Sequence, residues 1–331
     1  MEQTTESIRV EAAAFQECVA ALKAEVGRVF IGQPELVEHL IWCLFCGGHA
    51  LLEGAPGLGK TLLVNTLCRA LDLRFSRVQC TPDLMPADVI GTNLLVEDAH
   101  AGRAFRFQPG PIFANVVLAD EINRATPKTQ SAFLEAMQEH RVTVFGATHP
   151  LEEPFCVFAT QNPIEMEGTY PLPEAQLDRF FFKLTVRLPG IDELSQIMSL
   201  TTTGDAPAVH ARYGAVAVRA MGRLVRQVKL AEDVKRVALR LMLATHAESA
   251  EATPLAKRFV RYGASPRAAQ AMILAGKARA LAAGRYHVAA EDILAVAHPA
   301  LAHRIVLNFE GEMQRVGADA IVGEALAAAR V

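Results

Sequence analysis

The sequence has no strong excess of either charge. Its 331 residues include 33 Lys and Arg against 36 Asp and Glu, which gives a formal net charge of −3 at pH 7. A chain that binds a long polyanion is usually strongly basic, so this balance argues against a nucleic-acid machine. The content of 51% apolar and 21% charged residues is typical of a globular protein. The length suggests about two domains rather than one compact core.

Long hydrophobic runs are also missing. One of the longest, residues 41–46, stops at Gly47 and Gly48, far short of the roughly 20 apolar residues that cross a bilayer. Residues 1–6 have neither the basic start nor the apolar stretch of a signal peptide. We therefore expect no membrane span and a cytoplasmic location.

Cysteine is scarce, and the positions of the cysteines do not suggest a redox or metal-binding role. Cys43 and Cys46 form a C-x-x-C pair on an expected helix, but no second pair completes a zinc site. The cysteines stand mostly in apolar segments, as reduced buried thiols do. We expect packing rather than a redox or metal role for Cys18, Cys43, Cys46, Cys68, Cys80 and Cys156.

What the sequence does contain is a glycine-rich stretch at residues 54–61, which reads GAPGLGKT. It follows an apolar run at 50–53 and opens an amphipathic segment at 62–71, as the G-x-x-x-x-G-K-[ST] phosphate-binding pattern requires. Glycines allow positive φ and close backbone approach, so successive N–H groups can point at phosphate oxygens. The helix that follows adds the positive end of its dipole. The stretch predicts a nucleoside triphosphate site rather than an ordinary glycine-rich turn.

Two side chains of this stretch have specific expected roles. Lys60 can reach the β- and γ-phosphates, and the hydroxyl of Thr61 can coordinate Mg²⁺. The residues expected around the nucleotide phosphates are Gly54, Ala55, Pro56, Gly57, Leu58, Gly59, Lys60, Thr61 and Leu62.

An apolar run at residues 115–119 ends in two carboxylates, Asp120 and Glu121. Its continuous apolar character suits a parallel strand that is covered on both faces. We expect this strand beside the phosphate-loop strand, because ligands of α/β sheets bind at the carboxyl ends of strands. Asp120 can then hold Mg²⁺, and Glu121 can orient and polarise the attacking water. The alternative is an acidic pair on a solvated turn.

Asn162 follows another apolar run, residues 155–159. If that strand lies between the other two, the Asn162 amide reaches the same crevice and can contact both the γ-phosphate and the water. The alternative is a turn residue of the Asn-Pro type.

Two arginines bear on whether the protein works alone or in a ring. Arg179 ends a short helical turn at 174–179 and precedes a strand; a cation there is favoured by the helix dipole in any case. Ser265 is a natural N-cap and Pro266 a natural first helical residue, so Arg267 falls in the first turn, where positive charge is disfavoured. An anion nearby, such as a nucleotide phosphate, would relieve that conflict.

Strands and helices alternate up to residue 188, which predicts a parallel α/β sheet. We expect residues 81–112 to be irregular with short strand pieces at 89–91 and 105–107, and a hairpin from 141–145 and 148–151. From about residue 192 the pattern is helical, without strands. We therefore expect an α/β domain at 1–190, followed by a linker and a small helical domain at 191–331.

Together these segments resemble the MoxR family of AAA+ ATPases over nearly the whole chain, from about residue 29 onward. The resemblance rests on five ordered motifs: residues 54–61 (Walker A), 116–124 reading VVLADEINR (Walker B), 158–163 reading FATQNP (sensor 1), 172–180 reading LPEAQLDRF, and 262–268 reading YGASPRA (sensor 2).

The resemblance implies an ATP and Mg²⁺ site on a P-loop core with a C-terminal helical lid. Residues 81–112 would hold the helix-2 insert and residues 141–154 the pre-sensor-1 hairpin, both facing a ring's central pore. Gly32 and Gln33 match the segment that lies near adenine in the family.

The resemblance also implies roles for the arginines. Arg179 would be the finger that completes a neighbouring subunit's site, and Arg267 would contact the bound nucleotide from the lid. Arg124 belongs to the Walker B motif, but whether it acts within its own subunit or across the interface stays open. MoxR proteins look like hexameric ATPases that act as chaperones, often with von Willebrand factor A domain partners.

The leading hypothesis is therefore ATP hydrolysis by a ring, coupled to remodelling a protein client. A nucleic-acid-dependent AAA+ motor is a second hypothesis. Against it, acidic residues surround Arg103 and Arg106 in the insert, and no aromatic stacking platform stands out. A nucleotide-gated assembly scaffold is a third, because the same residues would serve it.

Overall fold

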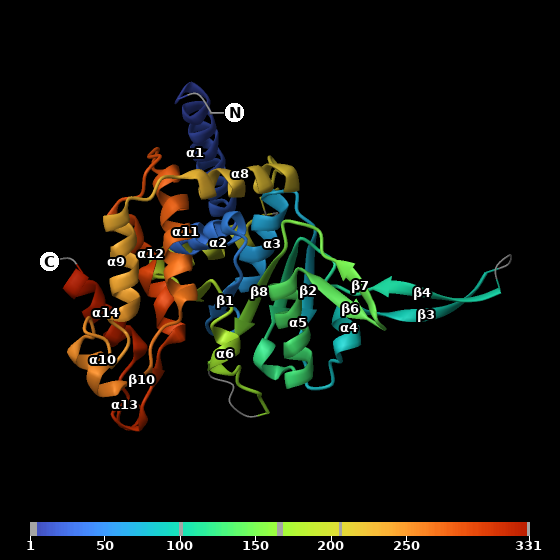
Figure 1. Ribbon diagram of the computed structural model, residues 1–331. Helices are drawn as coiled ribbons and strands as arrows, with labels where there is room; N and C mark the ends of the chain where they lie inside the picture. The colour runs from blue at the N-terminus through green and yellow to red at the C-terminus, as the bar shows by residue number, and fades with distance from the viewer. Residues whose placement is uncertain (1–4, 99–101, 164–167, 205–206, 330–331) are drawn as a thin grey trace.

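The computed structural model describes residues 5–98, 102–163, 168–204 and 207–329. Among them, five parallel strands form a central sheet in the order β2-β5-β8-β1-β9 (Figure 1). The strands are β1 (Ala50–Glu53), β2 (Phe75–Gln79), β5 (Val116–Asp120), β8 (Cys156–Gln161) and β9 (Phe182–Thr185). The predicted parallel α/β sheet is confirmed.

The strand order corrects one prediction. The Asp120 strand, β5, does not lie beside the phosphate-loop strand β1, because β8 stands between them. Phe158 of β8 is aligned with Ala50 of β1 on one side and with Leu118 of β5 on the other. The same order meets the condition set for Asn162, which follows a strand between the other two.

Alternate residues along each strand face two different layers of helices. Ala50, Leu52 and Phe158 join the cluster of buried apolar side chains that contains α1 (Thr5–Gly27), α2 (Pro34–Cys46) and α3 (Lys60–Ala70). Leu51 and Ala159 join a second cluster with α5 (Pro127–Glu139). Burial on both faces explains why these strands read as continuous apolar runs.

The insert is more regular than predicted. It contains α4 (Pro86–Ile90) and a hairpin of β3 (Gly91–Asp98) and β4 (Gly102–Pro109), which projects from the body in Figure 1. The expectation of irregular chain was therefore wrong, and so was the strand piece at 89–91, since residues 89 and 90 end a helix. The strand piece at 105–107 is confirmed as part of the longer strand β4. The hairpin's Leu95 and Phe105 are exposed, so a one-sided burial pattern could not signal it. Residues 99–101 lie outside the described residues.

The predicted hairpin is confirmed with a small shift in its bounds. It consists of β6 (Arg141–Val144) and β7 (Ala147–Pro150), which pair antiparallel. The turn between them is formed by Phe145 and Gly146, with φ of 49° and 81°, as the two-residue turns of hairpins require.

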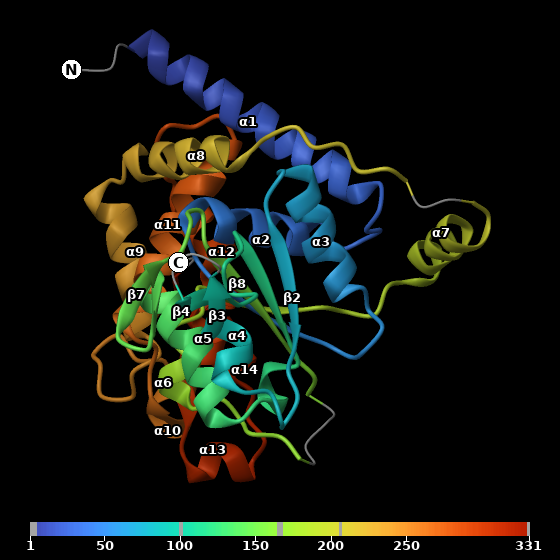
Figure 2. The same ribbon diagram turned by 90° about the vertical axis from the view of Figure 1, so that its right-hand side faces the viewer.

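The rest of the chain is mainly helical, as predicted. A short helix, α6 (Glu174–Leu177), precedes β9, and the helices that follow the sheet are α7 (Ile191–Thr202), α8 (Ala215–Gln227), α9 (Glu232–Leu243), α10 (Pro254–Phe259), α11 (Pro266–Ala282), α12 (Ala290–Leu301), α13 (Phe309–Met313) and α14 (Ala318–Ala329). The prediction of no strands was wrong, because β10 (Val260–Tyr262) and β11 (Val306–Leu307) form a short antiparallel pair. Figure 2 shows α7 standing apart from the other helices.

The sheet and the helical region share one continuous apolar core. The cluster that begins on the sheet runs through α1, α2 and α3 and on into α8, α9, α11 and α12. Helix α11 packs against α1 and α2, and α8 packs against α2. The length alone suggested two separate cores. In the structure, the helical region instead packs against helices that cover the sheet.

The cysteines pack in the core, as predicted. All six are buried and free of disulfides. Burial raises the pKa of Cys18 to about 11 and the pKa of Cys46 and Cys80 to about 12, so these thiols stay protonated. Among the described residues, no group of three or more His, Cys, Asp or Glu side chains is placed to hold a metal. No described helix combines the length and apolar character needed to cross a membrane.

Candidate functional site

The glycine-rich loop connects β1 to α3, so strand, turn and helix succeed one another as predicted. Gly57 and Gly59 have φ of 80° and 79°, a conformation that side-chain-bearing residues rarely adopt. A Cβ at Gly54 would lie 2.7 Å from the carbonyl oxygen of Val186. Helix α3 begins at Lys60, which directs its N-terminal amide groups at the loop.

The loop and the carboxyl ends of β2, β5 and β8 enclose a cavity of about 430 Å³. The sheet thus brings together the predicted phosphate loop, Asp120, Glu121 and Asn162. The described residues that line the cavity are Pro56, Gly57, Leu58, Gly59, Lys60, Thr61, Leu62, Arg77, Gln79, Asp120, Glu121, Thr160 and Asn162.

Lys60 is held against the loop that it follows. Its Nζ donates to the carbonyl oxygens of Gly54 at 2.7 Å and Ala55 at 2.8 Å. Partial burial lowers the pKa of Lys60, while the carboxylates of Asp120 and Glu121 oppose that shift. The ammonium group is therefore fixed at the mouth of the loop, beside the two acidic residues.

Thr61 and Asp120 form a pair of hard oxygen donors that suits Mg²⁺. The Thr61 hydroxyl lies 3.4 Å from Asp120 Oδ2. Mg²⁺ is typically held by one or two protein oxygens together with water and substrate phosphates. Two donors at this distance, next to a phosphate-binding loop, fit that pattern.

Glu121 is held in a strained conformation. Its φ of 56° and ψ of 52° are left-handed, which a residue with a side chain keeps only when its surroundings enforce it. Its N–H donates to Thr160 Oγ1 at 2.7 Å. Its carboxylate accepts from Gln79 Nε2 at 2.9 Å and from Arg124 Nη1 at 3.1 Å. Hydrogen bonds within the subunit thus hold Glu121, the general-base candidate, at both its backbone and its side chain.

Sequence reasoning missed three residues that contact the acidic pair. The Thr160 hydroxyl donates to Asp120 Oδ1 at 2.6 Å while accepting the Glu121 N–H. Arg77 and Gln79 reach Asp120 and Glu121 from the neighbouring strand β2. The alternation of polar Arg77, buried Val78 and polar Gln79 could have placed both polar side chains on one face.

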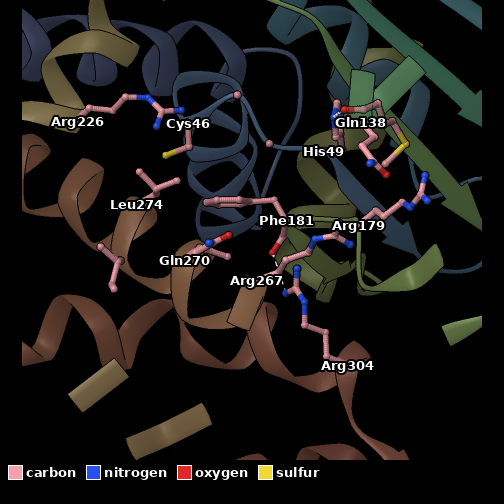
Figure 3. Close-up of a pocket in the computed structure, with 15 residues that line it drawn as sticks. Cys46, His49, Gln138, Arg179, Phe181, Arg226, Arg267, Gln270, Leu274 and Arg304 are labelled. Atoms are coloured by element: carbon pink, nitrogen blue, oxygen red, sulfur yellow. Dashed lines mark hydrogen bonds between the residues drawn. The ribbon is translucent and has the colours of Figure 1, made fainter. Parts of the chain in front are cut away.

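A second cavity, of about 660 Å³, is rich in arginine (Figure 3). Arg179, Arg226, Arg267 and Arg304 line it. In Figure 3, Arg179, Arg267 and Arg304 gather near Phe181, while Arg226 lies across the cavity. Arg179 Nη1 donates to the Leu134 carbonyl of α5 at 2.9 Å. Neither Arg179 nor Arg267 is among the described residues lining the phosphate-loop cavity.

Asp178 connects this cavity to the helical region. Its carboxylate accepts from Ser265 Oγ at 2.5 Å, Arg267 Nη1 at 3.2 Å and Arg304 Nε at 2.9 Å. The predicted cap is confirmed, because the Ser265 hydroxyl accepts from the Arg267 N–H and Pro266 begins α11. The anion beside Arg267 in the structure is the Asp178 carboxylate, and contact with a nucleotide stays a prediction.

Gly32 and Gln33 lie before α2. The Gln33 amide pairs with the backbone of Arg187, donating at 3.1 Å and accepting at 2.8 Å. The Glu193 carboxylate of α7 lies against Gly32, in the space that a Cβ at this position would need. Neither residue is among the described ones that line the phosphate-loop cavity, so their place near adenine stays a prediction.

Comparison with known families gives the class. Residues 49–182 match the ATPase family associated with various cellular activities (AAA), and residues 252–325 match the AAA lid domain. The chain is therefore an AAA-class ATPase domain followed by a lid, which agrees with the sheet and helical region described above. Neither match reaches residue 190, so the domain boundary drawn there stays a prediction.

Individual relatives narrow the class to a family. The chain is 40% identical over 308 residues to chaperone MoxR1 of Mycobacterium tuberculosis, covering 91% of this chain and 79% of the relative. It is 32% identical over 319 residues to protein MoxR of Paracoccus denitrificans, covering 92% and 91%. The chain is also similar to the crystal structure of a provisionally named ATPase from Cytophaga hutchinsonii. The two sequences are 38% identical, and the superposition covers 97% of each chain with a TM-score of 0.90. The chain belongs to the MoxR family of AAA+ ATPases.

Proposed function

We propose that this protein hydrolyses ATP in a homo-oligomeric ring, a hexamer, and uses the cycle to remodel or activate a client protein complex in the cytoplasm. The observation that carries the proposal is the separation of two half-sites. The phosphate-loop cavity contains the binding and water-activating groups, whereas Arg179 lines a different cavity. A complete site then requires a second subunit.

The first half-site binds the triphosphate. The loop amides and Lys60 contact the phosphates, and Thr61 and Asp120 supply the oxygen ligands for Mg²⁺. When bound, Mg²⁺ neutralises charge that develops on the transferring phosphoryl group. Thr160 keeps the Asp120 carboxylate oriented by its 2.6 Å hydrogen bond.

Water activation belongs to Glu121 and Asn162. The two residues end neighbouring strands, β5 and β8, and line the same cavity. A carboxylate can accept the proton of the attacking water, and an amide can donate to the γ-phosphate while accepting from that water. The strained backbone of Glu121 supports a positioned role for its side chain.

The second half-site is the arginine cavity. We assign Arg179 as the finger that reaches the neighbouring subunit's γ-phosphate, and Arg267, which lines the same cavity, as a contact to the bound nucleotide from the lid. A guanidinium supplied in trans is typically worth about 10³–10⁵ in rate. The cavity of about 660 Å³ between α5, α8 and α11 leaves room for a phosphate chain beside these arginines.

The hairpins are the proposed contacts with the client. Phe105 of the β3–β4 hairpin and Phe145 of the β6–β7 turn are 74% and 80% exposed, and large exposed apolar side chains mark interaction sites when they gather. We place both hairpins at the ring's central pore. A partner with a von Willebrand factor A domain would deliver or receive the client, in keeping with the chaperone name carried by the M. tuberculosis relative.

Dilution tests the ring directly. Specific ATPase activity and particle mass are measured together over a wide range of protein concentration. If the site is shared between subunits, activity per protomer falls as the ring dissociates. Constant activity in a preparation that sediments as a monomer contradicts the proposal. Client activation by Glu121→Gln with ATP, compared with wild type, separates hydrolysis-driven work from nucleotide-gated assembly.

A further inference from the structure

Arg77 of strand β2 holds the metal-binding aspartate. Its Nη2 lies 2.7 Å and its Nε 3.0 Å from Asp120 Oδ2. Both N–H groups converge on one carboxylate oxygen, in charge-assisted hydrogen bonds that are stronger than neutral ones. The Asp120 side chain is 11% exposed and that of Arg77 is 49% exposed, so the cation approaches the buried carboxylate from the open side of the cavity.

The oxygen that Arg77 holds is the one that faces Thr61. The Thr61 hydroxyl lies 3.4 Å from the same Oδ2, while Oδ1 accepts from Thr160. Mg²⁺ binds carboxylate oxygens at about 2.0–2.1 Å. A divalent ion on Oδ2 would therefore stand a few ångströms from the guanidinium, and the two like charges would repel each other. The ion pair and metal coordination at Oδ2 oppose one another.

Arg77 also connects the metal site to the general base. Its Nη2 donates to Gln79 Oε1 at 2.8 Å, and Gln79 Nε2 donates to Glu121 Oε2 at 2.9 Å. Gln79 is aligned with Asp120 in the parallel pairing of β2 and β5, and Arg77 with Leu118. One chain of contacts thus runs from Asp120 through Arg77 and Gln79 to Glu121.

We propose that Arg77 is a positioning residue that competes with Mg²⁺ for Asp120. The guanidinium neutralises the aspartate and keeps it aimed at Thr61, and it must leave Oδ2 when the metal is coordinated. When Arg77 leaves, the Gln79 side-chain oxygen also loses the hydrogen bond from Arg77 Nη2. Metal binding at Asp120 is thereby linked to the Gln79 amide, which donates to Glu121. This inference rests on the proposed Mg²⁺–nucleotide site and deepens it.

The test is metal affinity rather than turnover. Mn²⁺, which takes the same oxygen ligands, is titrated into the full chain saturated with ADP and followed by electron paramagnetic resonance. We compare wild type with Arg77→Gln, which removes the positive charge, and with Arg77→Lys, which keeps the charge but cannot donate two guanidinium N–H groups to Asp120 Oδ2. Arg74→Gln is the matched control, because Arg74 stands just before β2 and pairs instead with the exposed Glu152.

Arg77→Gln should tighten Mn²⁺ binding by roughly three- to tenfold, the range of a partly exposed ion pair. Arg77→Lys should lie between it and wild type, and Arg74→Gln should match wild type within about twofold. Unchanged or weaker Mn²⁺ binding by Arg77→Gln, or an equal change in Arg74→Gln, overturns the competition. If instead the wild-type chain shows no metal-dependent nucleotide binding at all, the proposed function itself has failed.

Discussion

Asp178 and Arg304 form an ion pair between the core and the lid, with Arg304 Nε 2.9 Å from Asp178 Oδ1. The Arg304 side chain is 2% exposed, and it also donates to the carbonyl oxygens of Asp178 and Phe180. Arg267 of α11 contacts the other carboxylate oxygen. Arg179 directly follows Asp178 in the chain. By holding Asp178, the lid therefore fixes the segment that carries the proposed finger.

We expect Asp178→Ala to destabilise the fold by about 3 kcal/mol, because it leaves the buried Arg304 guanidinium without its counter-ion. The free energy of unfolding from denaturant titration measures the loss. Asp319→Ala is the control: that carboxylate is 80% exposed beside His298, and its removal should change stability by less than about 0.5 kcal/mol. Equal stability of Asp178→Ala and wild type would show that Arg304 does not depend on this partner.

Thr160→Val keeps the side-chain shape but removes the hydroxyl between Asp120 and Glu121. The Glu121 N–H then loses its acceptor in a partly buried position; the loss of a hydrogen-bond partner at a fully buried group typically costs about 1–3 kcal/mol. We expect a lower kcat, because the strained Glu121 backbone is no longer held, together with a lower melting temperature. Thr143→Val, on the exposed face of β6, should leave both unchanged. Full turnover by Thr160→Val would remove the positioning role of the hydroxyl.

Glu121→Gln should bind ATP and retain it, with hydrolysis reduced by at least about 10²-fold, since the amide cannot accept the proton of water. Single-turnover hydrolysis and equilibrium binding of a fluorescent ATP analogue measure the two effects separately. Glu139→Gln, at the C-terminal end of α5, serves as the control. Hydrolysis by Glu121→Gln at the wild-type rate would contradict the water-activating assignment.

His49 makes stability depend on pH in the acidic range. Its Nδ1 accepts from the Val157 N–H at 2.9 Å, so Nε2 carries the hydrogen that is donated to the Met137 carbonyl. Burial lowers the pKa of His49 to about 4, from an ordinary value of 6.5. Between these pH values the unfolded chain binds a proton that the folded chain does not, so stability is complete above pH 6.5 and falls as pH drops towards 4.

The slope from His49 alone is about 1.4 kcal/mol for each pH unit in that window. Burial also lowers the pKa of His39 and His303, so the wild-type slope is steeper than that of one group. We expect His49→Gln, whose amide can both donate and accept, to flatten the slope in denaturant titrations at several pH values. His298→Gln, at a half-exposed histidine, should leave it unchanged. An identical slope in wild type and His49→Gln would contradict this account.

The sequence predicted those features that have a local cause. The glycine loop requires particular φ values, and the acidic pair ends a run whose burial on both faces makes it continuously apolar. Strand order was harder, because β1, β5 and β8 share the same apolar character and nothing local says which of them are neighbours. The β3–β4 hairpin was missed because exposed side chains on it leave no alternation to read.

Long-range polar contacts were beyond local reasoning. Asp178 meets Ser265, Arg267 and Arg304, which lie 87, 89 and 126 residues further along the chain. The unfavourable charge of Arg267 at the start of α11 did signal a nearby anion. Its identity in the structure, a carboxylate of the core, follows from how the lid packs on the core, and that is a property of the folded chain.

The sharing of the site between subunits is tested most directly by mixing two inactive variants. Lys60→Ala lacks phosphate binding but keeps Arg179, and Arg179→Ala has the reverse defect. In randomly mixed rings, about a quarter of the interfaces then combine an intact phosphate loop with an intact neighbouring finger. We predict that the mixture hydrolyses ATP well above the sum of its parts, while Lys60→Ala mixed with Glu121→Gln, both defective in the same half-site, does not. The contradicting result is an ATPase activity of the Lys60→Ala and Arg179→Ala mixture that only equals the sum of the two separate activities, in rings shown to exchange subunits. The finger would then not be supplied by the neighbour.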